Sequence, residues 1–489
     1  MQRTNLSRML FYLSIIFLFF LSGICGGLTP ASANTPGLQS GVFVVGSPAS
    51  RTVTRPTEQV SVEKGQAGTA KYRRVDFPDG QIYWMYRSEF NRDTPATLNL
   101  KFRIRGTGGT FSFYNPRKQL VTVPLTGTLP KAAGFIQTSE ATWYISYPAI
   151  LQNLPRHSVQ EKYTSLPLQV SETREGYELL IRFPRQSGTF GEIWAVGGTR
   201  QSLNWQDPLV VKAFRLLGQS QQMKWSWDGY YDLAPDSYVP GGRNVYWRFP
   251  DNYVARSLVE MNEQNPLGRA LGWVMLKIGS GNQNSRGYWE SAPVSGWLWK
   301  EYGIGGGFFD TRFNSDFARL LLQGYTTYKE PGFLAGARRY AGWLNTYAET
   351  KHVTTVAGGR TGWLLPDYFW PQKARPTHTS LNHQLAEINF LYHLYELTGE
   401  TRYEKLAEKL LNGVRNTRGF WGKPDGSLRY AYLRGREVGE DYPYLTYNDL
   451  WETQQFRVRF YGKADRDLEL LMAGKKRWMD RHGITGYKR

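Results

Sequence analysis

Cysteine is almost absent from the 489-residue sequence, which contains a single one, Cys25. Cys25 lies in the N-terminal apolar segment, and the bulky Ile24 directly before it makes a poor lipoprotein signal. If that segment is removed, the remaining chain has no disulfide and no thiol chemistry. Disulfide-framed folds and cysteine-based catalysis are therefore excluded for the mature chain.

Several catalytic motifs are also missing. The sequence has no Gly-x-Ser-x-Gly elbow, no Walker loop and no dinucleotide-binding fingerprint. Of its six histidines, His378 and His383 are five residues apart and lack the acidic pattern of a zinc hydrolase. We therefore expect no metal site and no organic cofactor in catalysis, while a structural divalent cation stays open.

The N-terminus is built like an export signal. Arg3 and Arg8 precede an uncharged apolar run, Met9–Ile24, and the small residues Ala31–Ala33 follow. This order predicts a signal peptide over residues 1–33 with cleavage after Ala33. The run is shorter than the roughly 20 residues that a membrane span needs, so a retained anchor is the alternative. We expect a secreted or cell-surface protein.

Acidic residues are outnumbered by basic ones. Lys and Arg number 60 against 41 Asp and Glu, a net charge of +19, and removal of Arg3 and Arg8 leaves +17. Such an excess favours an anionic partner. Because the basic residues are scattered and the chain carries an export signal, we expect no nucleic acid but an acidic polysaccharide or the anionic cell envelope. The alternative is that the charge only keeps the protein near the cell wall. Aromatic residues make up 15%, and their rings suit sugar faces.

The first half of the chain has the sequence pattern of β-strands. Residues 34–75 are rich in Thr, Ser, Gly, Pro and charge, which indicates a flexible linker or arm. Leu98–Arg105 then alternates apolar and basic residues, and Thr110–Tyr114 follows a glycine turn. Other strand candidates are Gln81–Tyr86, Gln119–Leu125, Ala141–Ser146, Glu178–Phe183 and Glu192–Val196. Period-two runs between turns predict an antiparallel β-sandwich or barrel over residues 76–215.

From about residue 240 the period becomes helical. Apolar residues recur at three- and four-residue steps over Ser380–Leu397, and a break at Thr398–Thr401 leads into a second helix. An earlier helical hairpin breaks at Pro331-Gly332, and its Phe333 precedes Tyr403 of the later hairpin by 70 residues. Repeating helical hairpins predict an α/α barrel or toroid over residues 240–489.

Polar aromatic and basic residues gather between Trp363 and Trp451, at loops and helix starts that can meet at one rim of such a barrel. The candidates are Arg375, His378, Asn382, Arg429, Tyr430, Tyr432, Tyr442, Tyr444 and Tyr447. Each tyrosine alone is typical of core or rim packing. As a group near basic residues, they indicate a binding cleft.

The same segment resembles a known family. Ser380-Leu381-Asn382 opens a helix, and a hairpin helix then leads to the tyrosine-bearing loop Gly426–Tyr432 and the tyrosine-rich helix start Asp441–Tyr447. This order is similar to the C-terminal domain of the D-glucuronyl C5-epimerases, over about residues 244–461. The family's Tyr-His-x-x-His string corresponds to Tyr444–Leu450, where both histidines are absent. The resemblance implies a β-rich domain followed by a helical, epimerase-like barrel.

The resemblance also implies a reaction, the inversion of C5 in uronic acid residues of an acidic glycan. One group removes the C5 proton, another returns a proton to the opposite face, and cations neutralise the carboxylate. Tyr430 and Tyr444 would be the base and the acid, in either order, if nearby cations lower their pKa values. Arg375, His378 and Arg429 would neutralise the carboxylate. The other substrate-binding candidates are Asn382, Tyr432 and Tyr447; Tyr432, Tyr442 and Tyr447 are substitutes for the catalytic pair if the register differs by a few residues.

Other functions stay open at this point. A polysaccharide lyase shares the first proton abstraction and then expels the C4 substituent. A glycoside hydrolase of the same toroid class needs paired carboxylates, and nothing in the sequence pairs the available Glu290, Asp310 and Asp367. A non-catalytic glycan-binding cell-wall protein would have aromatic platforms without a convergent Arg, Tyr and His cluster.

Overall fold

The computed structural model describes residues 42–45, 53–66, 68–163, 166–199, 207–218, 221–261 and 265–488. The expected signal peptide, residues 1–33, lies outside these ranges, so its cleavage after Ala33 stays a prediction. Among the described residues, no helix has both the length and the apolar character that crossing a membrane requires.

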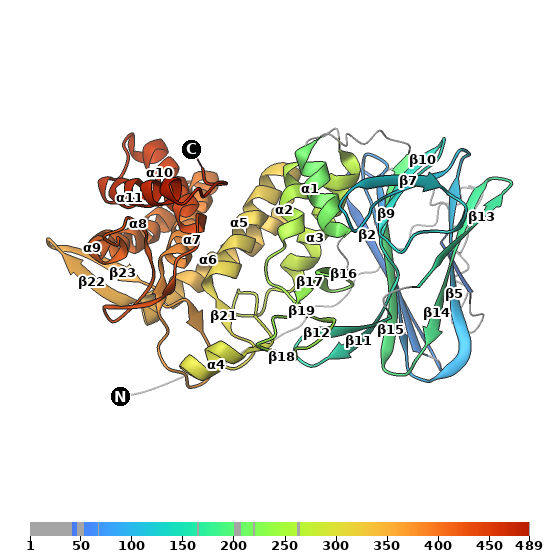
Figure 1. Ribbon diagram of the computed structural model, residues 1–489, viewed down its shortest axis with the longest axis horizontal. Helices are drawn as coiled ribbons and strands as arrows, with labels where there is room; N and C mark the ends of the chain where they lie inside the picture. The colour runs from blue at the N-terminus through green and yellow to red at the C-terminus, as the bar shows by residue number, and fades with distance from the viewer. Residues whose placement is uncertain are drawn as a thin grey trace, which may run out of the picture. The chain divides into compact units, whose positions relative to one another are not determined.

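Two β-sheets form the first part of the described chain (Figure 1). The smaller has the strand order β1-β5-β14-β13-β8 and is antiparallel except for the β1–β5 pair. Its strands are β1 Val42–Val45, β5 Thr94–Arg105, β8 Gly127–Thr128, β13 Leu168–Thr173 and β14 Gly176–Arg185.

The larger sheet is antiparallel and has the order β16-β17-β19-β12-β11-β15-β10-β9-β6-β7, with the β2–β3–β4 meander attached to β15. Its strands are β2 Thr57–Gly65, β3 Gly68–Asp76, β4 Ile82–Phe90, β6 Thr110–Tyr114, β7 Leu120–Pro124, β9 Gly134–Gln137, β10 Ala141–Ile145, β11 Ala149–Leu154, β12 Ser158–Tyr163, β15 Thr189–Thr199, β16 Met223–Ser226, β17 Gly229–Leu233 and β19 Val245–Arg248. The predicted antiparallel β-sheet region is confirmed.

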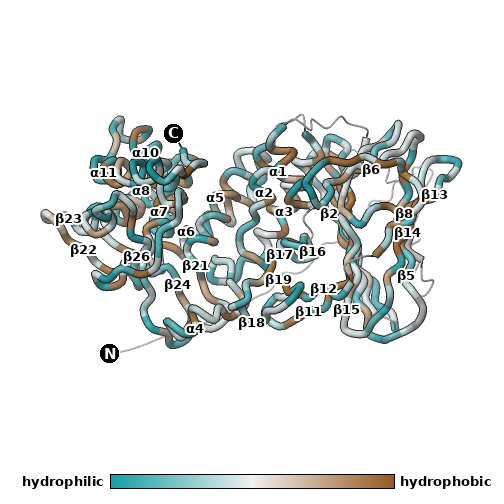
Figure 2. The backbone as a smooth tube through the Cα atoms, viewed as in Figure 1, coloured by the Kyte–Doolittle hydropathy of each residue, from teal (hydrophilic) through white to brown (hydrophobic). Residues whose placement is uncertain are grey.

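Alternating residues bury both faces of the larger sheet. On β4, Trp84 packs with Phe102 of β5 in the core between the two sheets. Its neighbours Tyr83 and Met85 point to the other face and join a core that includes Phe214 of the following helix α1 and residues of the later helices. Figure 2 shows brown, hydrophobic segments in the sheet region and in the region of α3. The sheet and the helices therefore share one continuous core.

The β-region extends beyond the predicted limits of 76–215 on both sides. Within the arm expected over 34–75, Thr57–Gly65 and Gly68–Asp76 form the β2–β3 hairpin. β2 pairs only with β3, and most of its side chains are exposed, so its apolar alternation is limited to the exposed Val60 and Val62. After α1, the strands β16, β17 and β19 return to the same sheet, because β19 pairs with β12, β17 with β19, and β16 with β17.

Helical hairpins make up the rest of the described chain, from yellow-green α2 to red α11 (Figure 1). The helices are α1 Pro208–Leu217, α2 Tyr253–Glu260, α3 Pro266–Gly281, α4 Gly296–Tyr302, α5 Thr311–Tyr328, α6 Pro331–Lys351, α7 Leu381–Thr398, α8 Thr401–Asn416, α9 Arg418–Trp421, α10 Leu445–Tyr461 and α11 Arg466–Arg481. Short ladders join β18 Tyr238–Val239 to β20 Val294–Ser295, β21 Phe309–Asp310 to β24 Tyr368–Phe369, β22 Val353–Ala357 to β23 Arg360–Leu364, and β25 Thr379–Ser380, β26 Arg429–Leu433 and β27 Arg436–Glu440 to one another.

The hairpins have an inner and an outer row, as an α/α toroid does. α5 contacts α2 and α7, and α7 contacts α10, while α6, α8 and α11 each pack against the helix before them in the chain. The inner helices α2, α5, α7 and α10 line a cavity of about 670 Å³. The predicted helical hairpins are confirmed, including the break at Pro331 and the helix over Ser380–Leu397.

Candidate functional site

Two buried aspartates lie at the N-terminal ends of the inner helices α5 and α7. Asp310 is the N-cap of α5 and accepts a hydrogen bond from the Phe313 backbone N at 3.0 Å. Asp367 accepts hydrogen bonds from both the backbone N (2.7 Å) and Oγ (2.6 Å) of Ser380, which directly precedes α7. Carboxylates satisfy the free N–H groups of a first helical turn well. The β21–β24 pair, with Asp310 opposite Tyr368, brings the two segments together.

His378 connects Asp367 to α4. Its ring is fully buried, with Nδ1 2.7 Å from the hydroxyl of Tyr302, the last residue of α4, and Nε2 3.1 Å from Oδ2 of Asp367. His383, one turn into α7, lies with Nδ1 2.9 Å from Thr311 Oγ1 and 3.7 Å from Asp367 Oδ2. Asp367 is thus the centre of a polar cluster.

Burial shifts the pKa values of the Asp310 and His383 side chains in this cluster in opposite directions. It raises the pKa of Asp310 to about 7, and the charge of Asp367 adds to the rise. It lowers the pKa of His383 to about 4, with Arg312 adding to the effect. For Asp367 burial acts upward, but His383, His378 and Ser380 outweigh it and hold the pKa below its usual value. At neutral pH Asp367 is therefore ionised, whereas Asp310 is poised between its two states.

Tyr430, on β26, lies over this cluster. Its ring centroid lies 5.9 Å from that of His378, and its hydroxyl lies near the Ser380 side chain. The Tyr442 ring is another 5.9 Å away and is 45% exposed. On the α4 side, the Trp297 ring lies 5.8 Å from that of His378 and is 40% exposed. We call the residues around Asp367, from Trp297 to Tyr442, the Tyr430 site.

The tyrosines of the Tyr430 site hold their protons tightly. Burial raises the pKa of Tyr430, and the charges of Asp367 and Tyr442 add to the rise. The pKa values of Tyr302, Tyr368 and Tyr442 are raised as well, again chiefly by burial. The expected lowering by nearby cations is therefore wrong for Tyr430 and for its substitute Tyr442. Their hydroxyls are proton donors at neutral pH.

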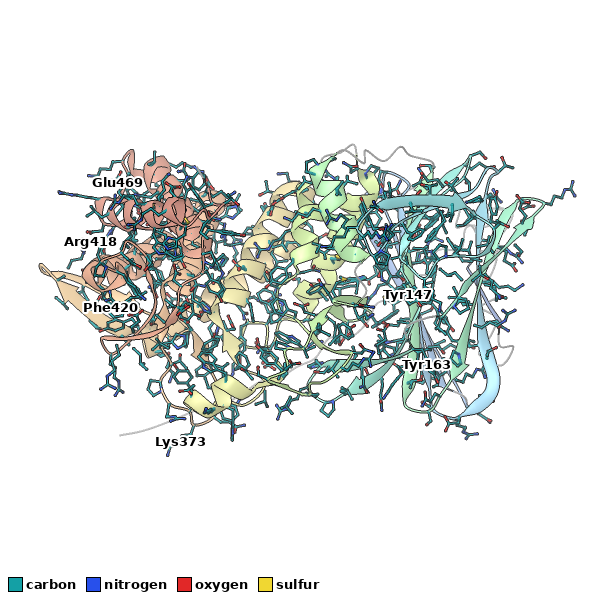
Figure 3. All side chains as sticks on the ribbon, in the orientation of Figure 1. Tyr147, Tyr163, Lys373, Arg418, Phe420 and Glu469 are labelled. Atoms are coloured by element: carbon teal, nitrogen blue, oxygen red, sulfur yellow. The ribbon has the colours of Figure 1, made fainter. Side chains whose placement is uncertain are left out.

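The two arginines expected to neutralise a substrate carboxylate are held by backbone carbonyls. Arg429 Nη1 donates to the carbonyls of Phe420 (2.6 Å) and Gly422 (2.9 Å), and its Nε donates to Glu437 (3.0 Å). Phe420 is labelled in Figure 3. Arg375 is exposed, and its Nη2 donates to the Lys300 carbonyl at 2.8 Å. The structure places neither guanidinium against Tyr430 or His378.

The remaining predicted residues lie around the Tyr430 site or apart from it. Tyr432 packs its ring on Phe420 at 5.0 Å. Tyr444 is exposed at the N-cap of α10, and Tyr447 packs on Tyr487 of the C-terminal segment. Asn382 is buried, and its backbone carbonyl accepts a hydrogen bond from Arg312 Nη1 at 3.0 Å. Of the predicted residues, the structure brings together Tyr430 and His378, with Tyr442 as the neighbouring tyrosine.

Arg312 is a buried cation in the first turn of α5. It pairs with Asp449 of α10 at 2.6 Å and with Asp316 of α5 at 2.7 Å, and it lowers the pKa of Tyr442 against the effect of burial. Both carboxylates also line the central cavity. Across the described ranges, no group of three or more His, Cys, Asp or Glu side chains is placed to hold a metal ion.

Sequence reasoning missed the residues that complete the cluster, namely Tyr302, Tyr368, Ser380 as a hydrogen-bonding partner, and His383. It named Asp310 and Asp367 without a reason to pair them. The available signal was local: Asp310 precedes a helical pattern, as an N-cap does. The two aspartates are 57 positions apart in the sequence, so no spacing argument reveals their proximity.

No protein-family model matches the sequence, and no curated protein matches it. Among solved structures, a family 76 glycoside hydrolase from a bovine Bacteroides thetaiotaomicron strain is 11% identical, with 87% of this chain and 78% of that chain covered and a TM-score of 0.39. Cellobiose 2-epimerase from Spirochaeta thermophila is 15% identical (47% and 59% covered, TM-score 0.32). The family 76 mannosidase Bt3792 from Bacteroides thetaiotaomicron is 13% identical (36% and 45% covered, TM-score 0.28), so the chain spans less than half of that enzyme's length. The chain is thus distantly similar in structure to α/α-toroid carbohydrate enzymes.

Proposed function

We propose that this chain is a carbohydrate-active enzyme that inverts C5 of uronic acid residues in an acidic glycan. The supporting observation is that Tyr430 lies beside His378 and Ser380, both of which are in direct contact with the ionised Asp367. As the Ser380 proton passes to Asp367, the Tyr430 proton can pass to Ser380. In the same concerted step Tyr430 accepts the C5 proton, so that Asp367 ends protonated and no free phenolate has to form against the raised pKa of Tyr430. This relay replaces the lowering by cations that the sequence suggested.

Tyr442 is the group we assign to return a proton. It lies beside Tyr430, is half exposed, and keeps its proton at neutral pH because burial raises its pKa. An inversion requires that this proton reaches the face of C5 opposite to the one from which Tyr430 takes its proton, since C5 loses a proton on one side and gains one on the other. Trp297 offers a partly exposed ring on which the sugar can stack.

A glycoside hydrolase is less well supported by the same geometry. It needs two carboxyl groups that reach the substrate. Asp367 is fully buried, and its two oxygens accept hydrogen bonds from Ser380. Asp367 therefore serves as a hydrogen-bond acceptor inside the protein. Asp310 then has no second carboxylate beside it that faces solvent and could act on the substrate.

Hydrogen exchange tests the proposal. Incubating the protein with a glucuronic acid polymer in D₂O should place deuterium at C5 without shortening the chains. Tyr430→Phe removes the proton carrier and keeps the ring, so exchange should fall by about 10²–10⁴-fold. Ser380→Ala should slow it too, because the relay is broken.

Tyr395→Phe is the matched control. Tyr395 lies near the far end of α7, and its ring packs on Phe460 at 5.2 Å, a contact that phenylalanine retains. Its exchange rate should equal that of the wild type. An ultraviolet-absorbing double bond in shortened chains would instead identify a lyase. Binding of polyuronates with neither exchange nor elimination would identify a binding protein.

A further inference from the structure

A groove of about 300 Å³ adjoins the Tyr430 site. It lies between the C-terminal end of α6 and the segment that follows β24, and its lining includes Lys351, Phe369, Trp370, Gln372 and Arg375. We call it the Lys351 groove. Its volume is at the lower end of the range of small-ligand pockets, about 300–1,000 Å³, which suits one residue of a chain.

The Lys351 groove has an unbalanced charge. Lys351 and Arg375 line it, whereas none of its described lining residues is acidic. Among the described ion pairs, neither cation has a carboxylate partner. Lys351 Nζ lies 5.8 Å from the Phe369 ring, and Arg375 is fixed by the Lys300 carbonyl. Both side chains are exposed, so both charges are free to meet an anion.

Aromatic rings complete the groove. Trp370 donates from Nε1 to the Gly306 carbonyl at 3.0 Å, which fixes its ring. Phe369 packs on Trp343 and Tyr347, with centroid distances of 5.5 and 5.9 Å. Both Phe369 and Trp370 remain partly exposed. Fixed rings beside cations suit a sugar that carries a carboxylate, because the rings stack on its C–H face.

Tyr368 joins the groove to the catalytic cluster. It lines the Lys351 groove, and its ring centroid lies 5.9 Å from His378 and 5.8 Å from His383. Thr377, another lining residue, holds the Tyr368 backbone N through its Oγ1 at 3.3 Å. Tyr368 therefore forms a wall that the Lys351 groove shares with the Tyr430 site.

We propose that the Lys351 groove binds the carboxylate of a second uronic acid residue, next in the chain to the one at Tyr430. This inference rests on the proposed function, since it assumes a polymeric acidic substrate. Lys351 and Arg375 neutralise the carboxylate, and Trp370 carries the sugar ring. The groove thereby selects chains with consecutive uronic acids over chains in which neutral sugars take that position.

Calorimetric titration with an oligoglucuronate, and with a neutral glucose oligosaccharide of equal length, tests the groove. Lys351→Gln and Arg375→Gln should each weaken oligoglucuronate binding about tenfold, as loss of a charged hydrogen-bond partner does, and leave the neutral ligand unchanged. Lys373→Gln is the control: Lys373 is exposed on the same segment and is labelled in Figure 3, but does not line the groove. It should bind within about twofold of the wild type, since an exposed charge outside the contact contributes little.

Equal oligoglucuronate binding by wild type, Lys351→Gln and Arg375→Gln would overturn the groove proposal, as would an equal loss from Lys373→Gln. The proposed function fails by a different readout. If the wild type shows no C5 exchange while the groove variants still weaken binding selectively, the groove stands as a uronate-binding site and the epimerase assignment falls.

Discussion

The larger sheet and the Tyr430 site bury their charges in different ways. In the sheet, Glu192 of β15 faces Arg87 of β4 at 2.7 Å, and Glu161 of β12 faces Lys224 of β16 at 2.9 Å. At the Tyr430 site, Asp310 and Asp367 have no Lys or Arg partner among the described ion pairs. Hydroxyl, backbone N–H and imidazole groups surround them instead.

The difference separates structural charges from those that can do chemistry. A cation held against a carboxylate opposes the effect of burial on both pKa values, although burial still raises the pKa of Glu192 and lowers that of Lys224. Hydroxyl and imidazole partners can exchange protons, so Asp310 titrates near pH 7 while Asp367 stays ionised. Burying a carboxyl group without a Lys or Arg partner lowers the stability of the fold, and such groups are typical of functional sites. The comparison therefore predicts that the two regions respond differently when a partner is removed.

The largest effect is expected in the sheet. Arg87→Met leaves Glu192 buried without its cation and should lower the free energy of unfolding by about 3–5 kcal/mol. Urea denaturation measures this. Arg103→Met is the control, because the Arg103 side chain is 56% exposed in its pair with Glu178 and should cost about 0–1 kcal/mol. Adding Glu192→Gln to Arg87→Met should restore part of the loss. Equal losses of unfolding free energy from Arg87→Met and Arg103→Met would contradict the special role of the buried pair in the sheet.

A smaller, pH-dependent effect is expected at Asp310. Its pKa rises from 3.8 to about 7 on folding, so the native state binds the proton more tightly and stability falls as pH rises from about 4 to 7. Asp310→Asn keeps the N-cap of α5 and removes this penalty, which amounts to at most about 4 kcal/mol at about 1.4 kcal/mol per pKa unit.

Denaturation at pH 5 and pH 8.5 measures the effect. Wild type should be less stable at pH 8.5, and the Asp310→Asn variant should lose less. The exposed Asp236 gives a control, since Asp236→Asn should follow the wild type at both pH values. If Asp310→Asn and wild type change in parallel, the carboxyl is not the titrating group that separates this site from the sheet.

The fold was largely predictable because its periods are local. Leu98–Arg105 alternates, and β5 spans Thr94–Arg105; Ser380–Leu397 has a helical period, and α7 spans Leu381–Thr398. β2 was missed for a physical reason: it is polar and mostly exposed, and it pairs with a single neighbour, so nothing in its sequence distinguishes it from an arm.

The candidate site was predictable only in part. Tyr430 and His378 lie in one candidate segment and do meet. Tyr302 and Asp310 come from α4 and α5, and only the packing of the hairpins brings them to His378 and His383. Nearness in sequence can also mislead. Arg429 directly precedes Tyr430, but its guanidinium donates to the carbonyls of Phe420 and Gly422.

The smallest effect concerns His393, which tests whether a shifted pKa needs a catalytic setting at all. His393 lines the central cavity, and burial lowers its pKa to about 4, with Arg319 and Arg459 adding to the shift. Its unfolded pKa is near 6.5, so the unfolded chain binds the proton more tightly and stability falls as pH drops from about 6.5 to 4. His393→Gln should reduce that loss by about 1 kcal/mol, a discounted figure because the side chain is partly exposed.

Denaturation at pH 7 and pH 5 measures this difference in stability, with the exposed His482→Gln as a control that should match wild type. In 1 M salt, where screening acts within about 3 Å, the arginine contribution should fade and the difference should shrink. A difference that salt leaves unchanged would assign the whole shift to burial, and none at all would remove His393 from the comparison.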